Sequence, residues 1–199
     1  MTDRRGRAAM RPAATPAGDV WVFGYGSLMW RPGFPYRCVE PALVYGYHRA
    51  FCVYSVRYRG TAARPGLVLG LDRGGSCRGR AFAIAAADAD QVFAYLDQRE
   101  LVTGVYRRRM VPAKLKSGWV SACTYVADRS HPQYAAKLSP ERAAGIILDG
   151  RGEAGGNVEY LANAVAHLDA LGIADGPLHA LLRRVEARLA RPAARGGGQ

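Results

Sequence analysis

Apolar and polar residues along this chain predict strands up to about residue 126, interrupted by one helix, and helices beyond that point. Residues 20–23 form an unbroken apolar run, which is typical of a strand buried on both faces. Residues 40–55 are rich in β-prone side chains, and Gly46 predicts a bend or bulge within them. Two later strands are expected at residues 105–111 and 119–126.

Residues 66–84 predict a β-hairpin. An apolar strand at 66–71 is followed by Asp-Arg-Gly-Gly at 72–75, which has the composition of a tight turn. Residues 77–84 then alternate, so that Ala81 and Ala83 face one way and Phe82 and Ile84 the other.

The first helix is predicted to begin at Asp88, whose carboxylate accepts a hydrogen bond from the Gln91 N–H as an N-cap. Its apolar face contains Val92, Tyr95 and Leu96, and the helix ends near Glu100.

Three helices are predicted in the C-terminal part. The first begins at Ser139-Pro140, the second is capped by Asn157 and closed by Gly172, and the third carries a stripe of apolar side chains. This order of strands and helices predicts an α+β fold, with a sheet curled toward a barrel and helices packed on it.

The length of 199 residues suits one folded domain, expected at residues 20–190. The Arg-, Ala- and Pro-rich segment 1–19 predicts a disordered basic leader, and 191–199 a disordered tail. The sequence shows no apolar run long enough to span a bilayer and no export signal, and its cysteines are expected to stay reduced. These observations favour a cytoplasmic protein.

The net charge of +12 raises the question of a nucleic-acid partner. The arginines are scattered, however, and successive members of the run 107–109 would alternate between the faces of a strand. We therefore expect a solvated basic surface and no nucleic-acid partner. The cysteines and histidines show no metal-ligand spacing, so no metal and no cofactor is expected.

The glycine-containing segment 24–28 follows the first buried strand. Gly24 and Gly26 allow backbone conformations closed to other residues, and a tight turn there can aim several N–H groups at one oxyanion. The alternative is an ordinary turn. Ser27 lacks the second glycine of a nucleophile elbow and any evident His–Asp pair, so we interpret it as a hydrogen-bond donor in the loop.

Glu100 is the acid best placed for chemistry, at the predicted C-terminal end of a short amphipathic helix. The helix dipole disfavours a carboxylate there, and burial would raise its pKa further, toward the range useful to a general base. The alternative is a solvent-exposed glutamate beside Arg99. Similarly, Tyr125 either presents its hydroxyl to a pocket or packs in the core.

Residues 22–30, Val-Phe-Gly-Tyr-Gly-Ser-Leu-Met-Trp, resemble the signature of ChaC-type γ-glutamylcyclotransferases. Further matches follow in order at residues 64–66, 95–100, 104–106, Tyr125 and 156–161. Together they extend from about residue 20 to residue 189, nearly the whole predicted domain.

This resemblance implies a small mixed β-barrel with flanking helices. It also implies a lyase-type reaction, in which the α-amine of glutathione attacks its own γ-carbonyl and releases 5-oxo-L-proline and Cys-Gly. In that reaction Glu100 is the acid and base, and no metal or other cofactor takes part. The γ-glutamyl group is held by Tyr25, Gly26, Ser27 and Leu28, with Tyr125 beside it, while Arg59 attracts the glycine carboxylate.

Two other functions compatible with the resemblance stay open. The same pocket could act on a different γ-glutamyl amine or amino acid, or the chain could be a non-enzymatic binding module. The sequence leaves the oligomeric state undetermined.

Overall fold

The computed structural model describes residues 18–191, so most of the predicted leader and tail lies outside the described residues. Five strands form a closed barrel in the order β1-β3-β2-β4-β5, which the parallel pairing of β1 with β5 closes. Their bounds are β1 Asp19–Gly24, β2 Cys38–Ser55, β3 Gly66–Ala85, β4 Tyr106–Lys114 and β5 Trp119–Ala127. The predicted α+β class and the small mixed barrel with flanking helices are confirmed.

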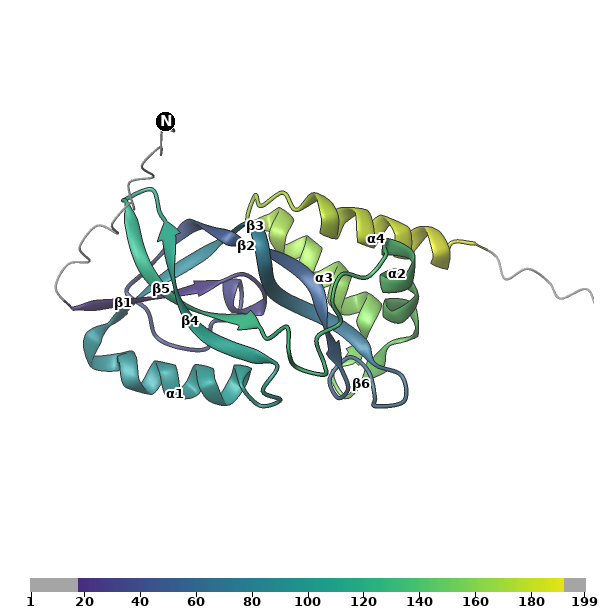
Figure 1. The fold of residues 1–199 in the computed structure, drawn as a ribbon. Helices are drawn as coiled ribbons and strands as arrows, with labels where there is room; N and C mark the ends of the chain where they lie inside the picture. The colour runs from purple at the N-terminus through teal and green to yellow at the C-terminus, as the bar shows by residue number, and fades with distance from the viewer. Residues whose placement is uncertain (1–17, 192–199) are drawn as a thin grey trace, which may run out of the picture.

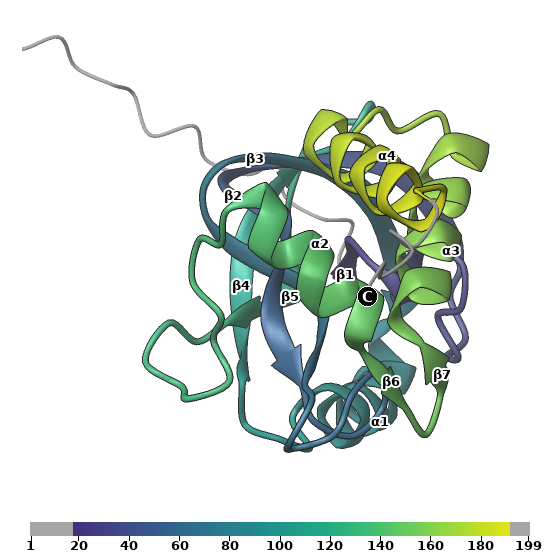
Figure 2. The same ribbon diagram turned by 90° about the vertical axis from the view of Figure 1, so that its right-hand side faces the viewer.

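Four α-helices flank the barrel: α1 Ala89–Glu100, α2 Pro140–Asp149, α3 Asn157–Ala170 and α4 Gly176–Leu189. Figure 1 shows α2, α3 and α4 gathered on one side of the long β2–β3 ribbon, whereas α1 lies apart from them along the other end of the barrel. In the turned view the three C-terminal helices again lie together, on the side that faces the viewer (Figure 2). Short 3-10 helices, η1 Ser27–Met29 and η2 Ala86–Asp88, and a small hairpin, β6 Arg151–Gly152 with β7 Gly155–Gly156, complete the chain.

The predicted hairpin at residues 66–84 is wrong, because β3 is one continuous strand. It pairs with β2 along its length, from Ser55 opposite Gly66 to Cys38 opposite Ala83. Gly74 and Gly75 do take left-handed conformations, with φ of +102° and +69°. They form a bulge opposite the predicted irregularity at Gly46 rather than a chain reversal, because the 18-residue β2 offers partners to both halves of β3.

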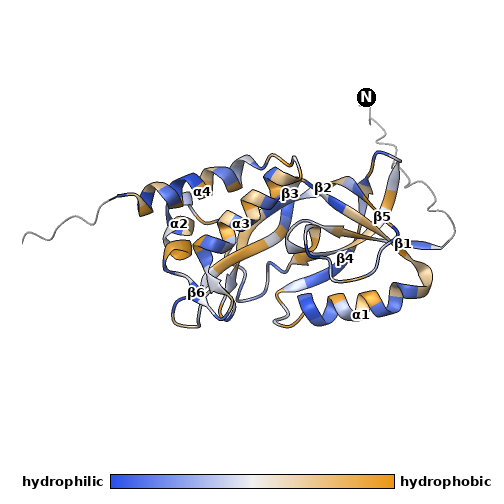
Figure 3. Cartoon of the chain, turned by 180° about the vertical axis from the view of Figure 1, so that it is seen from behind, coloured by the Kyte–Doolittle hydropathy of each residue, from blue (hydrophilic) through white to orange (hydrophobic). Residues whose placement is uncertain are grey.

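The barrel has a different apolar layer on each side of its wall. Ala81 and Ala83 belong to a cluster that fills the barrel and continues under α2, α3 and α4. Phe82 and Ile84 belong to the cluster under α1, as the predicted alternation requires. Figure 3 shows hydrophobic and hydrophilic residues side by side along α1, which agrees with one buried and one solvated face.

One edge of β3 is only partly covered by β1, which pairs with residues 80–85 and leaves the preceding part of the strand free. Asn157 fills this gap: its Oδ1 accepts from the Leu67 N–H at 2.6 Å, and its Nδ2 donates to the Leu67 carbonyl at 2.7 Å. The predicted capping role of Asn157 is therefore wrong, and Gly156 is the N-cap of α3. A fully buried amide is better satisfied by two backbone partners on another element.

Two other predicted caps had different outcomes. Ser139 accepts from the Arg142 N–H at 3.3 Å, as expected. Asp88 makes no side-chain cap, because it lies in the αR region at the end of η2, where the chain is already helical. No helix of the described residues is long and apolar enough to cross a membrane.

Candidate active site

The glycine-containing loop connects the end of β1 to η1. Within the described range neither Gly24 nor Gly26 has a positive φ, and Gly26, at φ −128° and ψ −134°, lies outside the ordinary strand and helical regions. Gly24 has a steric reason instead, because a Cβ at this position would lie 3.1 Å from the Cβ of Leu28. The loop therefore folds back tightly on itself and starts η1 directly after the strand.

The N–H groups of Gly26, Ser27 and Leu28 make no hydrogen bond within the described residues, 18–191. The first hydrogen bond of η1 comes later, from the Met29 N–H to the Gly26 carbonyl at 2.9 Å. The start of a helical turn leaves such N–H groups free. They belong to the wall of a small pocket of about 80 Å³. This pocket is lined by Tyr25, Gly26, Ser27, Leu28, Leu69, Glu100, Tyr106, Tyr125 and Tyr160.

Glu100 reaches this pocket from the C-terminal end of α1, with 19% of its side chain exposed. Within the described chain its only ion pair joins its Oε1 to the Nε of Arg99, at 3.2 Å. Burial raises the pKa of the Glu100 carboxyl, and the positive charge of Arg99 opposes that rise. The structure thus puts Glu100 in the shielded position rather than the solvent-exposed one.

Tyr25, Tyr106 and Tyr160 line the pocket together with Glu100. Tyr106 donates to the Leu69 carbonyl at 2.6 Å, and the Tyr160 hydroxyl accepts from the Leu69 N–H at 3.5 Å, so both continue the coverage of the free β3 edge. Burial raises the pKa of Tyr160 to about 12 and those of Tyr25 and Tyr106 well above their ordinary range. All three are therefore neutral at physiological pH and can donate hydrogen bonds.

Sequence reasoning did not select Tyr106 and Tyr160 as site residues. Both lie in segments that carried the family resemblance, at residues 104–106 and 156–161. Their place in those segments was the available signal. The signal could not be interpreted from the sequence, because Tyr106 on β4 and Tyr160 on α3 are brought together by Leu69 of β3.

Tyr125 packs in the core, as one interpretation of the sequence predicted, and its side chain also lies beside the pocket. It is 1% exposed and belongs to the cluster under α1. Its hydroxyl donates to the Oδ1 of Asp97 at 2.6 Å, while the Oδ2 of Asp97 pairs with Arg108 at 2.9 Å.

Arg99, on α1, makes hydrogen bonds to the segment that follows β1. Its Nη2 donates to the Ser27 Oγ at 2.8 Å, and its Nη1 donates to the Arg31 carbonyl at 3.0 Å. Ser27 thus accepts a hydrogen bond, where the sequence suggested a donor. Because a guanidinium cannot take a proton, this contact gives the Ser27 hydroxyl no general base.

A larger groove of about 650 Å³ shares Ser27, Glu100 and the Tyr106–Tyr160 pair with the small pocket. Arg59 lines this groove and not the small pocket. Its guanidinium donates to the Ala154 carbonyl and to the Gly156 carbonyl at 3.3 Å, and it lies 5.0 Å from the centroid of the Tyr160 ring. Arg59 therefore lies in the groove next to the small pocket, whereas the other predicted site residues line the pocket itself.

Other reactive groups are poorly suited to catalysis. Burial raises the pKa of Cys52 to about 12 and that of Cys123 to about 11, so both remain thiols at neutral pH. The described residues contain no group of three or more His, Cys, Asp or Glu side chains arranged to hold a metal ion. Glu100 is thus the carboxyl among the residues that line the small pocket.

The fold and the pocket together define a class of protein: a small closed barrel with a pocket that a largely buried carboxyl, that of Glu100, shares with the 26–28 loop. The family model of ChaC-like proteins matches residues 20–188, and the chain belongs to this family.

Two curated relatives and one solved structure show how far the similarity extends. The glutathione-specific gamma-glutamylcyclotransferase of Escherichia coli K12 is 36% identical over 174 residues, covering 87% of this chain and 75% of the relative. The enzyme of the same name from Schizosaccharomyces pombe is 37% identical, covering 77% of this chain and 86% of the relative. A crystal structure of a γ-glutamyl cyclotransferase specific to glutathione from yeast matches with a TM-score of 0.77 and 25% identity, covering 85% of this chain and 96% of that one.

Proposed function

We propose that this protein is a γ-glutamylcyclotransferase that cleaves glutathione into 5-oxo-L-proline and Cys-Gly. The observation that carries the proposal is the shielded Glu100 carboxyl, which shares a small pocket with the free N–H groups of the 26–28 loop. Membership of the ChaC family, and relatives named for this activity, support the choice of substrate.

The reaction begins with the α-amine of the substrate. This amine is largely protonated at neutral pH and must lose a proton before it can attack. Glu100 accepts that proton, a role that a raised pKa favours because it brings the strength of the base closer to the working pH. The amine nitrogen then forms a bond to the γ-carbonyl carbon, so that the substrate supplies its own nucleophile.

The attack turns the γ-carbonyl oxygen into an oxyanion. The N–H groups of Gly26, Ser27 and Leu28 are the donors that we assign to it, since none has an acceptor within the described protein. Glu100 then delivers its proton to the amide nitrogen as the carbon–nitrogen bond breaks, and the carboxylate so formed takes the second proton from the ring nitrogen, which leaves the lactam neutral. The products are 5-oxoproline and Cys-Gly, and no water is consumed.

The pocket also has to hold the substrate in a bent conformation, with its amine close to its γ-carbonyl. Tyr25 and Tyr125 form two of its walls, together with Leu28. Enclosure by these side chains confines the γ-glutamyl chain, and such confinement is a large source of rate in intramolecular reactions.

The leaving group then extends into the larger groove, which shares Glu100 and Ser27 with the pocket. Arg59, held by the carbonyls of Ala154 and Gly156 and by the Tyr160 ring, supplies positive charge for the glycine carboxylate. Because Arg59 is already engaged, it acts as a fixed charge at the groove wall rather than as a flexible arm.

Product identification tests the proposal. Purified protein is incubated with glutathione, and 5-oxoproline, Cys-Gly and free glutamate are quantified. Equal amounts of 5-oxoproline and Cys-Gly, without glutamate, are expected. Glutamate in place of 5-oxoproline would indicate hydrolysis, and no product at all would contradict the activity.

A substrate panel run in parallel separates the leaving groups. A γ-glutamyl amino acid and a γ-glutamyl amine contain the same γ-glutamyl group as glutathione. If either is turned over faster than glutathione, the reaction class stands and the substrate assignment is wrong.

The setting of the reaction is part of the same proposal. We expect a cytoplasmic enzyme without a nucleic-acid partner. The free thiols of Cys38 and Cys77 and the dispersal of the arginines among separate acidic partners support this expectation. DNA and RNA titrations at two salt concentrations test it, since a real site would show steep salt dependence.

A further inference from the structure

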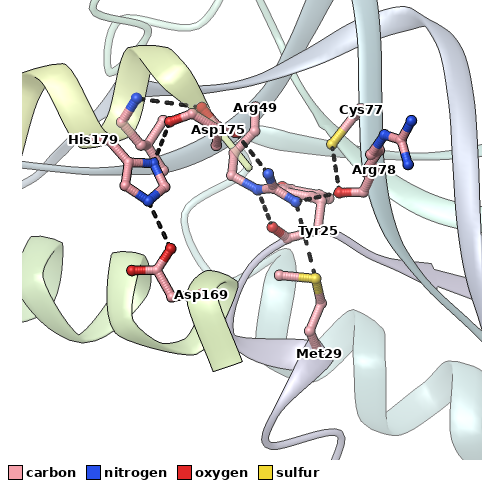
Figure 4. Close-up of polar contacts among 9 residues, drawn as sticks. Tyr25, Met29, Arg49, Cys77, Arg78, Asp169, Asp175 and His179 are labelled. Carbon is pink, nitrogen blue, oxygen red and sulfur yellow. Dashed lines mark hydrogen bonds and ion pairs between the residues drawn. The ribbon is translucent and has the colours of Figure 1, made fainter. Parts of the chain in front are cut away.

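Arg49 is a buried cation that belongs to neither the small pocket nor the groove. It projects from β2 and is 4% exposed. Its Nε donates to the Tyr25 carbonyl at 2.5 Å, its Nη1 to the Oδ2 of Asp175 at 2.7 Å, and its Nη2 to the Arg78 carbonyl at 2.5 Å. The same Nη2 lies 3.9 Å from the sulfur of Met29. Figure 4 shows this guanidinium between Asp175 on the helical side and Tyr25 on the loop.

The contact with Tyr25 fixes a peptide plane of the glycine-containing loop. The Tyr25–Gly26 peptide is trans, as are all peptides in the described range. In a planar trans peptide the C=O and the following N–H point in opposite directions. A Tyr25 carbonyl held against Arg49 therefore turns the Gly26 N–H away from Arg49, and Gly26 lines the pocket whereas Arg49 does not.

We propose that Arg49 is a positioning residue that orients the Gly26 N–H as an oxyanion donor by holding the Tyr25 carbonyl from behind. The inference rests on the proposed cyclotransferase function and adds to it a residue that touches no substrate. Met29, the last residue of η1, contacts the same guanidinium, so both ends of the loop are attached to one side chain.

Asp175 holds Arg49 in turn. One carboxylate oxygen accepts from Arg49, and the other accepts from the Leu178 N–H at 3.3 Å as the N-cap of α4. The C-terminal helical layer is thereby connected to the catalytic loop through two side chains. In this layer His179 bridges the Asp175 carbonyl, at 2.6 Å, and the Oδ1 of Asp169, at 2.7 Å, which steadies the turn before α4.

The test compares Arg49→Lys and Asp175→Asn with Val185→Ala. Lysine keeps the charge but cannot donate to three separate acceptors in a plane. Asparagine keeps a good N-cap and removes the charge that holds Arg49. Val185 is fully buried in α4, and none of the hydrogen bonds of Arg49 involves it. Its truncation therefore destabilises the same group of helices without altering the loop. Melting temperature, kcat and KM for glutathione are measured for all four proteins.

Arg49→Lys is expected to lower kcat at least about tenfold with KM within about twofold, since loss of one oxyanion donor typically costs about 10²–10³ in kcat. Asp175→Asn should shift kcat in the same direction by less, and Val185→Ala should keep the wild-type kcat despite a lower melting temperature. A Val185→Ala kcat that falls as far as that of Arg49→Lys, or an unchanged kcat in Arg49→Lys, overturns the proposal. If Arg49→Lys does not fold, the kcat of Asp175→Asn is compared with that of Val185→Ala instead: a lower kcat in Asp175→Asn alone supports the proposal, and equal values overturn it.

A second readout separates this inference from the proposed function. The amide chemical shift of Gly26 is recorded by NMR in the wild type, Arg49→Lys and Val185→Ala, whether or not glutathione is turned over. A shift that changes in Arg49→Lys and not in Val185→Ala supports the positioning role. An unchanged shift in Arg49→Lys overturns it, even if the wild type is an active cyclotransferase.

Discussion

Two buried charges lie beside the same loop, and their hydrogen-bonding surroundings differ. Arg49 has 2% of its side chain exposed and donates to a carboxylate and two backbone carbonyls. Glu100 has 19% exposed and a single neighbouring cation, Arg99, at 3.2 Å. Burial is the larger influence on the Glu100 carboxyl, and it raises the pKa.

The difference separates a charge that holds structure from a charge that does chemistry. A buried ion with all its hydrogen-bonding groups paired is fixed in one protonation state and one position. A buried carboxyl with one partner keeps free lone pairs and an altered proton affinity, which a general base requires. In this interpretation Arg49 positions residues 25–28, and this loop binds the oxyanion while Glu100 transfers the proton.

The largest effect is expected on removing the weakly paired charge. Glu100→Gln should lower kcat for 5-oxoproline release by about 10²–10⁴-fold, the usual contribution of a general acid–base group. The melting temperature should not fall, because the amide removes the need to bury a negative charge. Quantifying 5-oxoproline under saturating glutathione measures the rate.

The matched control is Asp90→Asn, which neutralises an exposed acid at the other end of α1. It should keep the wild-type kcat within about twofold. Equal losses in the two variants would mean that charge on the helix, rather than the position of Glu100, governs the rate.

A fully paired polar group should instead show its effect in stability. Asn157→Ala leaves the buried N–H and C=O of Leu67 without partners, so the free energy of unfolding should fall by about 3 kcal/mol. Urea unfolding measures the change. Asn163→Ala, an exposed position on the same helix, is the control and should cost nothing, because alanine is the better helix former.

If Asn157→Ala retains wild-type stability, the coverage of the free β3 edge is not a source of stability. The account of that edge would then have to be replaced.

The smallest effect is expected at Ser27. Ser27→Ala removes the hydroxyl that accepts from Arg99, but the three backbone N–H groups remain. We expect kcat to fall about threefold, in line with loss of about one modest hydrogen bond. Steady-state kinetics beside Ser117→Ala, a distant exposed serine, measures it. A loss as large as that of Glu100→Gln would identify Ser27 as a nucleophile after all.

Features determined by local pattern were predictable from the sequence. Residues 20–23, the alternation through Ala81 and Phe82, and the end of α1 at Glu100 all depend on neighbours within a few positions. These sufficed to bring Glu100 and the 24–28 loop forward as candidates. Membership of the family, predicted from the ordered motifs, is confirmed.

Features that depend on a distant partner were missed or misassigned. Gly74-Gly75 has turn chemistry, and only the length of β2 makes it a bulge. Asn157 has the sequence context of a helix cap, but both polar groups of its side chain bond to the backbone of Leu67, 90 positions away. Arg49 and Asp175 are 126 positions apart, so no local pattern announces their ion pair.

Direct titration of the Glu100 carboxyl is the measurement closest to the central claim. Carboxyl ¹³C NMR of the folded protein, with Glu100→Gln to assign the resonance, gives its pKa. The account predicts a midpoint above the ordinary value of 4.5, because burial outweighs Arg99. Activity would then be lost as the pH falls through that midpoint, and the contribution of Glu100 to folding stability would decrease as the pH rises through it. A midpoint at or below 4.5 would contradict the account, because Glu100 would then be a well-paired carboxylate like the other ion-paired acids of the surface.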